Sequence, residues 1–445
     1  MPVAILIFFL TIYTAVISAD SNNITSVKPE SVGLSSERLM NIDNIINQYI
    51  DEKKMAGSVV LVARHGKIAY FKATGLADTL KPMQKDSIMR IMSMSKPITS
   101  VATMLLYEQG KFLLSDPVSK YIPEFRNQKV LVPLPEGSAY PYKLVPVKRE
   151  VTIRDLLAHT SGLMYKGIAA AVYPNEAGRQ EMINMYKEAE INDGYCRTDE
   201  EIGDMVKRLA RLPLMKQPGE QWEYALNTDV LGYLVEVVSG MKFDKYVTDN
   251  IFKPLKMNDS YYNVPKEKTA RVARVFKSDW NGTLVRTTDD EVLVQGELIM
   301  CPNDAYKTSG TYLSGGGGVL STVYDYFRFS QMLLNGGELE GVRLLSRKTV
   351  ELMTATNHIG EYTPSLLHDE GWKFGLGFAI QKDRGHNVDA GDIGAFEWAG
   401  LYSTRFSVDP KEEKITIFMS QTTPFGHHFE LWDKLLVLSS SAIAD

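Results

Sequence analysis

The sequence has only two cysteines, Cys196 and Cys301, among 445 residues. In an oxidising compartment these thiols could pair, but one bridge in so long a chain would only supplement the hydrophobic core. Basic residues are not in excess either, because the formal net charge is -5, and we therefore expect no nucleic-acid partner. With 44% hydrophobic residues, the chain is an ordinary globular protein, long enough for a large core and two lobes.

Several well-known site signatures are missing as well. The chain contains no G-x-S-x-G, so an α/β-hydrolase would lack its nucleophile elbow. The glycine run 315–318 is not followed by Lys-Ser/Thr, and a tight turn beside a cleft explains it better than a phosphate-binding loop. His427, His428 and Glu430 could be read as metal ligands, but a C-terminal loop and helix start is the simpler explanation. We expect neither a metal nor another cofactor.

The N-terminus is typical of a secreted protein. Residues 1–19 form an uncharged apolar run that ends in small residues, which predicts a signal peptide cleaved near Ala19. Because no Lys or Arg follows Met1, an uncleaved signal anchor is the alternative. Three glycosylation triplets, which begin at Asn23, Asn258 and Asn281, favour the secretory route. We expect an extracellular glycoprotein with no membrane contact beyond the secretory signal.

Hydrophobic periodicity predicts elements at both ends of the chain. Apolar residues at helical spacing after Ser35 predict an amphipathic helix, and residues 57–75 predict two strands joined by a tight turn. Residues 404–421 predict a second strand pair. Helical patterns fill the middle, with capping boxes that open at Thr152 and Thr198. The strands are expected to share one sheet, with a helical lobe inserted between them.

A serine and a lysine stand at the start of a helical pattern in residues 90–106. If the helix begins near Ser93, Ser93 and Lys96 lie on one face, with Cβ atoms roughly 5–6 Å apart. Pro97 would then fall in the first turn, where a missing N–H costs least. A neutral amine can remove a serine proton, and burial on an apolar helix lowers the pKa of a lysine. Ser93 and Lys96 are therefore a workable nucleophile and base.

The motif S-x-x-K alone is weak, because Ser93 could equally be a helix cap followed by a surface lysine. A second match, from Ser239 to Lys242, follows an apolar helical run. There Gly240 would cap the helix and leave Lys242 in solvent.

Further motifs accompany the first one. Tyr224 comes just before a helix that is expected to open near Asn227 or Thr228, and the motif from Trp398 to Gly400 lies at the expected entry to a strand. Together with Ser93 and Lys96, "LLAHTSGL" at residues 156–163 and "LSGGGGVLSTVYDYF" from residue 313, these ordered motifs resemble the serine β-lactamase-like superfamily. This superfamily includes class C β-lactamases, DD-peptidases and, most similar here, the related esterases and acyltransferases. The resemblance covers residues 32–423.

The resemblance implies an α+β fold, in which an antiparallel β-sheet is flanked by helices. The family domain would span residues 32–430. Its α/β part would comprise about 32–125 and 305–430, with a mostly helical insert at about 126–304 and the active site at the junction.

The resemblance also implies roles for individual residues. Ser93 matches the acylated serine, Lys96 the lysine of the first motif, and Tyr224 the tyrosine that shares proton transfer with it. By analogy, the backbone N–H groups of Ser93 and Leu401 would form the oxyanion hole, in which each donor is typically worth about 3–4 kcal/mol.

The chain departs from the lactamase pattern in two places. Its third motif has Trp398 where lactamases carry a lysine or histidine, as in the esterase branch, and Trp398 and Gly400 are the expected substrate-binding residues. The asparagine two residues after the lactamase tyrosine is replaced by Leu226. A literal Tyr-x-Asn at Tyr261 lacks a helical context and is a weaker alternative. Arg405 is a cation that could replace the missing lysine.

These features predict a secreted serine carboxylesterase that cleaves a small-molecule ester through an acyl-enzyme on Ser93. An acyltransferase that uses the same acyl-enzyme is the first alternative. A β-lactamase or DD-peptidase, and a catalytically silent binding protein on this scaffold, are the weaker ones.

Overall fold

The structure is a computed structural model that describes residues 26–196, 198–278, 283–303, 310–362, 371–386, 390–423 and 429–445. The predicted signal peptide, the glycosylation candidates Asn23 and Asn281, and the pair His427 and His428 lie outside these ranges.

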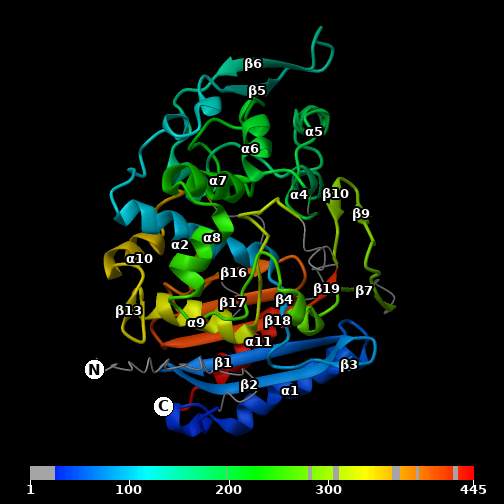
Figure 1. The fold of residues 1–445 in the computed structure, drawn as a ribbon, viewed down its shortest axis with the longest axis vertical. Coiled ribbons are helices and arrows are strands. Elements are labelled where there is room, and N and C mark those ends of the chain that lie inside the picture. Colours follow the sequence, from blue (N-terminus) through cyan, green and yellow to red (C-terminus); the bar gives the residue numbers. More distant parts are fainter. Residues whose placement is uncertain are drawn as a thin grey trace, which may run out of the picture.

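One antiparallel sheet joins the two ends of the chain (Figure 1). Its strand order is β14-β15-β16-β17-β18-β1-β2-β3. The N-terminal strand β1 pairs with the C-terminal strand β18, so that Val59 lies opposite Met419. This pairing confirms the predicted α+β fold with a sheet built from distant segments. The strands are β14 (Trp372–Phe374), β15 (Ala379–Gln381), β16 (Phe396–Gly400), β17 (Thr404–Asp409), β18 (Lys414–Ser420), β1 (Gly57–Arg64), β2 (Lys67–Asp78) and β3 (Lys81–Pro82).

The sheet is buried on both faces, and this explains its continuous hydrophobic runs. Successive side chains of β1 alternate between two cores. Leu61 packs into the large core that holds most of the helices, whereas Val60 and Val62 pack against α1 (Ser36–Asp51) and α11 (Phe429–Ser441). The terminal helices α1 and α11 thus cover one face of the sheet, and the large core covers the other.

The remaining helices lie on the side of the large core. Of these, α4 to α7 lie above the sheet in Figure 1, together with the β5–β6 hairpin. The helices are α2 (Ser95–Glu108), α3 (Ile153–Leu157), α4 (Lys166–Val172), α5 (Arg179–Glu188), α6 (Ile202–Ala210), α7 (Asn227–Ser239), α8 (Phe243–Val247), α9 (Val323–Leu334) and α10 (Arg347–Met353).

Short strands complete the described elements. The pairs are β4 (Met89–Arg90) with β11 (Leu320–Ser321), β5 (Lys129–Pro133) with β6 (Tyr142–Pro146), β9 (Leu293–Gln295) with β10 (Leu298–Met300), and β12 (Glu338–Leu339) with β13 (Val342–Arg343). A three-stranded sheet joins β19 (Thr422–Thr423), β7 (Phe276–Ser278) and β8 (Leu284–Arg286).

The predicted helix starts have different outcomes. Ser35 caps α1 by accepting the N–H of Arg38, and Thr152 forms a complete capping box with Asp155 at α3, as predicted. The second predicted box is wrong, because α6 begins at Ile202 and has no side-chain cap. The carbonyl of Thr198 instead accepts the N–H groups of residues 311 and 312, which ties it to another segment.

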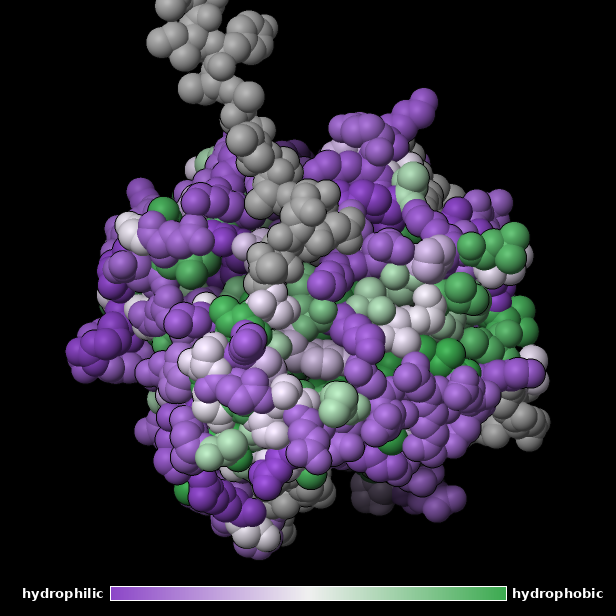
Figure 2. Space-filling view, turned by 90° about the horizontal axis from the view of Figure 1, so that it is seen from below, coloured by the Kyte–Doolittle hydropathy of each residue, from purple (hydrophilic) through white to green (hydrophobic). Residues whose placement is uncertain are grey.

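The face seen from below is mostly hydrophilic, with hydrophobic patches between the polar side chains (Figure 2). Exposed large hydrophobic side chains include Met40 of α1 and Val437 of α11. Among the described residues, no helix combines the length and the apolar character needed to cross a membrane.

Candidate active site

Ser93 lies in a strained turn between β4 and α2. A 3-10 helix, η3 (Met92–Met94), holds it, and α2 begins only at Ser95, two residues later than expected. Met92 has a φ of 46°, which is unusual for a residue with a side chain and costs about 1–3 kcal/mol. Such strain is found where the surrounding structure fixes a functional group. Ser93 itself is 7% exposed.

Lys96 points from the first turn of α2 toward Ser93. Its Nζ lies 3.3 Å from Ser93 Oγ and donates to Tyr165 Oη at 3.0 Å and to the Gly316 carbonyl at 2.8 Å. Lys96 is 1% exposed, and burial lowers the pKa of its amine to about 7, although the charge of Asp229 opposes this shift. A substantial fraction of Lys96 is therefore neutral near pH 7, as a general base requires.

Tyr224 reaches Ser93 from a second element. Its hydroxyl donates to Ser93 Oγ at 2.6 Å, and its ring centroid lies 4.7 Å from Lys96 Nζ. The residue stands just before α7, which begins at Asn227 as predicted. Burial raises the pKa of Tyr224 above its usual range, and the hydrogen bond to Ser93 offsets this only in part. The phenol therefore stays protonated near neutral pH and holds Ser93 Oγ by donating a hydrogen bond to it.

The third motif ends a strand and does not open one. Trp398 and Gly400 belong to the last residues of β16, and Trp398 packs 5.5 Å from the ring of Tyr224. A Cβ atom on Gly400 would lie 2.1 Å from the Ile91 carbonyl oxygen. Only glycine lets the end of β16 approach the turn that carries Ser93 so closely.

These elements enclose an apolar cavity of about 320 Å³ in front of Ser93. None of its described lining residues carries a charge. Leu401, the second predicted oxyanion donor, lines the same cavity as Ser93. The lining residues are Ser93, Ile168, Ala171, Val172, Tyr195, Tyr224, Leu298, Trp398, Ala399, Gly400, Leu401 and Phe429.

Several site residues were not identified from the sequence. Tyr165 and Asp229 have no local signal, although the glycine run did indicate the turn that brings Gly316 to Lys96. His159, in the segment "LLAHTSGL", accepts the N–H of Ala225 through Nδ1 at 3.3 Å. Its ring lies 5.2 Å from that of Tyr224, so it helps to fix the tyrosine.

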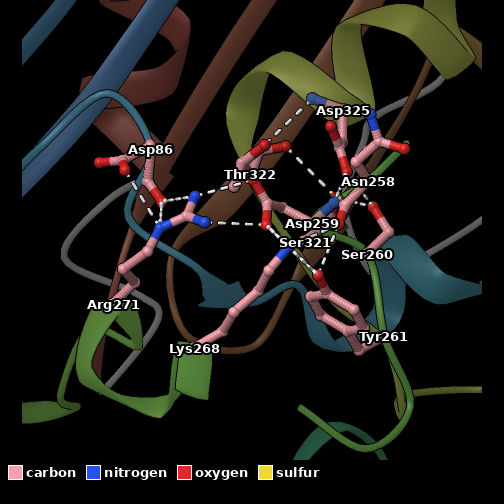
Figure 3. Close-up of polar contacts among 10 residues, drawn as sticks. All are labelled: Asp86, Asn258, Asp259, Ser260, Tyr261, Lys268, Arg271, Ser321, Thr322 and Asp325. Carbon is pink, nitrogen blue, oxygen red and sulfur yellow. Dashed lines mark hydrogen bonds and ion pairs between the residues drawn. The ribbon is translucent and has the colours of Figure 1, made fainter. Parts of the chain in front are cut away.

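The alternative motifs do not lie in the site. Ser239 ends α7, where Gly240 adopts a φ of 70°, and Lys242 is exposed and paired with Glu201. This confirms that the second S-x-x-K is a helix terminus. Tyr261 instead belongs to a polar cluster around Asp259, where it accepts a hydrogen bond from Lys268 at 2.6 Å (Figure 3).

Arg405 does not replace the missing lysine. Its Nε donates to the buried Glu397 at 3.2 Å, and its guanidinium lies 5.2 Å from the ring centroid of Trp432. Because neighbouring residues of β16 point to opposite faces, Glu397 holds Arg405 on the side of α11, away from Trp398.

The two cysteines form a disulfide beside the cavity. Cys196 follows Tyr195, and Cys301 comes shortly after Leu298, so the bridge joins two walls of the cavity.

Comparisons with known proteins agree with this geometry. The profile of the Beta-lactamase family matches residues 42–439. The chain is 30% identical to Esterase EstB of Burkholderia gladioli over 86% of this chain and 91% of the esterase. It is 27% identical to Acyltransferase mokF of Monascus pilosus over 75% and 76% of the two chains. Among solved structures, EstCE1, a hydrolase with promiscuous acyltransferase activity, has a TM-score of 0.75 and 26% identity, covering 92% of this chain and 99% of its own.

Proposed function

Because the chain belongs to the Beta-lactamase family, we propose that it is a secreted serine hydrolase that cleaves carboxylic esters through an acyl-enzyme on Ser93. The main observation behind this proposal is that Lys96 and Tyr224 both contact Ser93 Oγ, and that Ser93 lines an uncharged cavity. Esterase and acyltransferase relatives support serine acyl-enzyme chemistry in general. The uncharged lining of the cavity favours a neutral carboxylic ester as the substrate.

Acylation would begin with attack of Ser93 Oγ on the ester carbonyl carbon. The serine proton passes to the neutral amine of Lys96, either directly or through Tyr224. The N–H groups of Ser93 and Leu401 donate to the oxyanion that forms. When the carbon–oxygen bond breaks, the proton moves to the alkoxide, and the alcohol leaves.

Deacylation would use the same groups in reverse. Water attacks the acyl carbon, gives its proton to the base, and releases the acid with Ser93 restored. If an alcohol takes the place of water, the product is a new ester and the enzyme is an acyltransferase. The acyltransferase relatives favour this as the second candidate function.

Secretion is a separate part of the proposal. The apolar segment 1–19 and the disulfide between Cys196 and Cys301 support it, because disulfides persist mainly in oxidising compartments. Asn258 is exposed and remains a glycosylation candidate. N-terminal sequencing of protein from the culture medium of a eukaryotic host should find a start near residue 20, whereas an intact residue 1 would contradict cleavage.

A fluorophosphonate probe tests the nucleophile. The wild-type protein should be labelled, and Ser93→Ala should not be, because the probe reacts with the activated hydroxyl. Ser239→Ala is the matched control, since it alters the other S-x-x-K motif, and it should be labelled as the wild type is. Labelling that persists in Ser93→Ala would overturn the assignment. Release of acid from p-nitrophenyl butyrate, with and without added alcohols, then separates hydrolysis from acyl transfer.

A further inference from the structure

A buried carboxylate faces the Lys96 amine across Gly316. Asp229 is the third residue of α7 and is fully buried, and its Oδ1 accepts the hydroxyl proton of Tyr312 at 3.2 Å. A Cβ atom on Gly316 would lie 2.7 Å from Asp229 Oδ2 and 3.1 Å from Lys96 Nζ. The Tyr165 hydroxyl lies 2.7 Å from the same position, so the amine, the carboxylate and this hydroxyl converge where a side chain on residue 316 would stand.

The other described groups around Lys96 are not anions near neutral pH. Ser93 and Tyr165 contact Nζ by their hydroxyls, and Tyr224 presents its ring. His159 is neutral, because burial and the nearby Lys96 lower the pKa of its imidazole. Burial raises the pKa of the Asp229 carboxyl, whereas the charge of Lys96 and the hydrogen bonds of Ser314, Tyr312 and the Gly316 backbone oppose this shift and favour the carboxylate; the charge of Asp229 also reaches the carboxyl of Asp193.

We propose that Asp229 is a positioning residue that acts through Lys96, by stabilising the ammonium that forms when Lys96 takes the proton of Ser93. This inference rests on the proposed function. In each acylation the O–H bond of Ser93 breaks, a new N–H bond forms on Lys96, and the proton later leaves on the alcohol. The ammonium exists only between these two events, on a side chain that is 1% exposed and so is screened little by water. A fixed carboxylate supplies that stabilisation at no cost of reorganisation.

Loss of the Asp229 charge should shift the pH dependence of Ser93 reactivity in one direction. The charge of Asp229 raises the pKa of Lys96 against the effect of burial. Removing this charge lowers the pKa of the amine, so Lys96 remains neutral, and Ser93 remains reactive, to a lower pH. The amine is then also a weaker base, so the limiting rate at high pH should fall.

The experiment measures the rate of Ser93 labelling by a fluorophosphonate as a function of pH. The acid limb of this pH profile is the range in which the labelling rate falls as Lys96 becomes protonated. In Asp229→Asn and Asp229→Ser, the acid limb should move down by about 1–3 pH units relative to the wild type. The limiting rate should fall roughly 10-fold, because proton transfer weakens with basicity. Asp229→Glu, which restores a carboxylate, should return the acid limb toward that of the wild type.

Asp325→Asn is the matched control. Asp325 is a second buried carboxyl whose pKa burial raises to about 7, so its titration could produce a similar limb. It lies at the start of α9, where it accepts the N–H of Asp259 and the hydroxyl of Ser260, and none of these three residues lines the cavity in front of Ser93 (Figure 3). Asp325→Asn should leave the acid limb where the wild type has it.

The outcomes are distinguishable. An acid limb that stays in place in a folded Asp229→Asn or Asp229→Ser variant would overturn the role of Asp229, because a merely structural contact does not set a titration. A limb that moves in Asp325→Asn would do the same. Wild-type protein that the probe does not label would instead contradict the proposed function.

Discussion

At the scale of single residues, Ser93 depends on two groups with different protonation states. Lys96 is a base with a pKa of about 7, and Tyr224 is a phenol that remains protonated near neutral pH. Activity should therefore rise as the pH increases through about 7, since protonated Lys96 cannot accept the serine proton. Lys96→Ala and Tyr224→Phe should each lower kcat/KM by roughly 10²-fold or more.

Tyr165→Phe is the control for these two variants. It removes one hydrogen-bond partner of Lys96 but leaves every group that contacts Ser93 Oγ. Its loss should be smaller, on the order of 10-fold or less, which is the effect of about 1 kcal/mol. Near wild-type turnover of Tyr224→Phe would move the proton shuttle to another group, with Tyr165 as the first candidate.

At the scale of an element, we expect β16 to set the choice of substrate. Its alternation places Trp398 on the cavity side and Glu397, with Arg405, on the opposite side. Anionic β-lactams thus lose a charge-assisted contact of about 1.5–3 kcal/mol, or roughly 10- to 150-fold in affinity. Neutral short esters such as p-nitrophenyl acetate carry no anionic group, so they lose no such contact. We expect their kcat/KM to exceed that for nitrocefin or D-Ala-D-Ala peptides.

The Trp398→Phe variant separates shape from charge in this comparison. It keeps an aromatic ring beside Tyr224 and should still favour the ester. Trp398→Lys introduces the cation and should move the ester-to-nitrocefin ratio toward the lactam. A wild-type ratio that favours nitrocefin would refute the ester assignment.

At the scale of the whole molecule, the disulfide supplements a large core. It links residues 105 positions apart, so the chain-entropy account gives it about 4–5 kcal/mol at most. The double variant Cys196→Ala/Cys301→Ala should fold, with a Tm lower by roughly 5 °C or less for a chain of this size. Because the bridge joins two cavity walls, KM for esters should rise more than kcat falls.

Reduction of the wild-type protein with a phosphine provides the control, and it should give the same Tm as the double variant. A double variant that does not fold would mean that the bridge is essential, contrary to its expected supplementary role. An unchanged Tm would mean that the bridge contributes nothing measurable.

The sequence by itself determined the local features of this protein. Hydrophobic periodicity was enough to predict α1 from residues 35–50, and β1, β2, β17 and β18 from the two strand pairs. Each pattern reflects the burial of one segment of the chain. The three-residue spacing of Ser93 and Lys96 was enough to predict their contact, although Ser93 lies in the 3-10 turn that precedes α2 and only Lys96 lies on the helix itself. Tyr224 and Trp398 came from a resemblance between motifs, not from periodicity.

Only the tertiary structure decided what surrounds these residues. Lys96 contacts Tyr165 and Gly316 across 69 and 220 positions of the chain, and no local pattern encodes partners at such separations. The same holds for Asp229, whose charge matters only because α7 and the glycine turn bring it to the amine. Burial, which lowers the pKa of Lys96, is likewise a property of the assembled core, since it requires elements from the whole chain to exclude water.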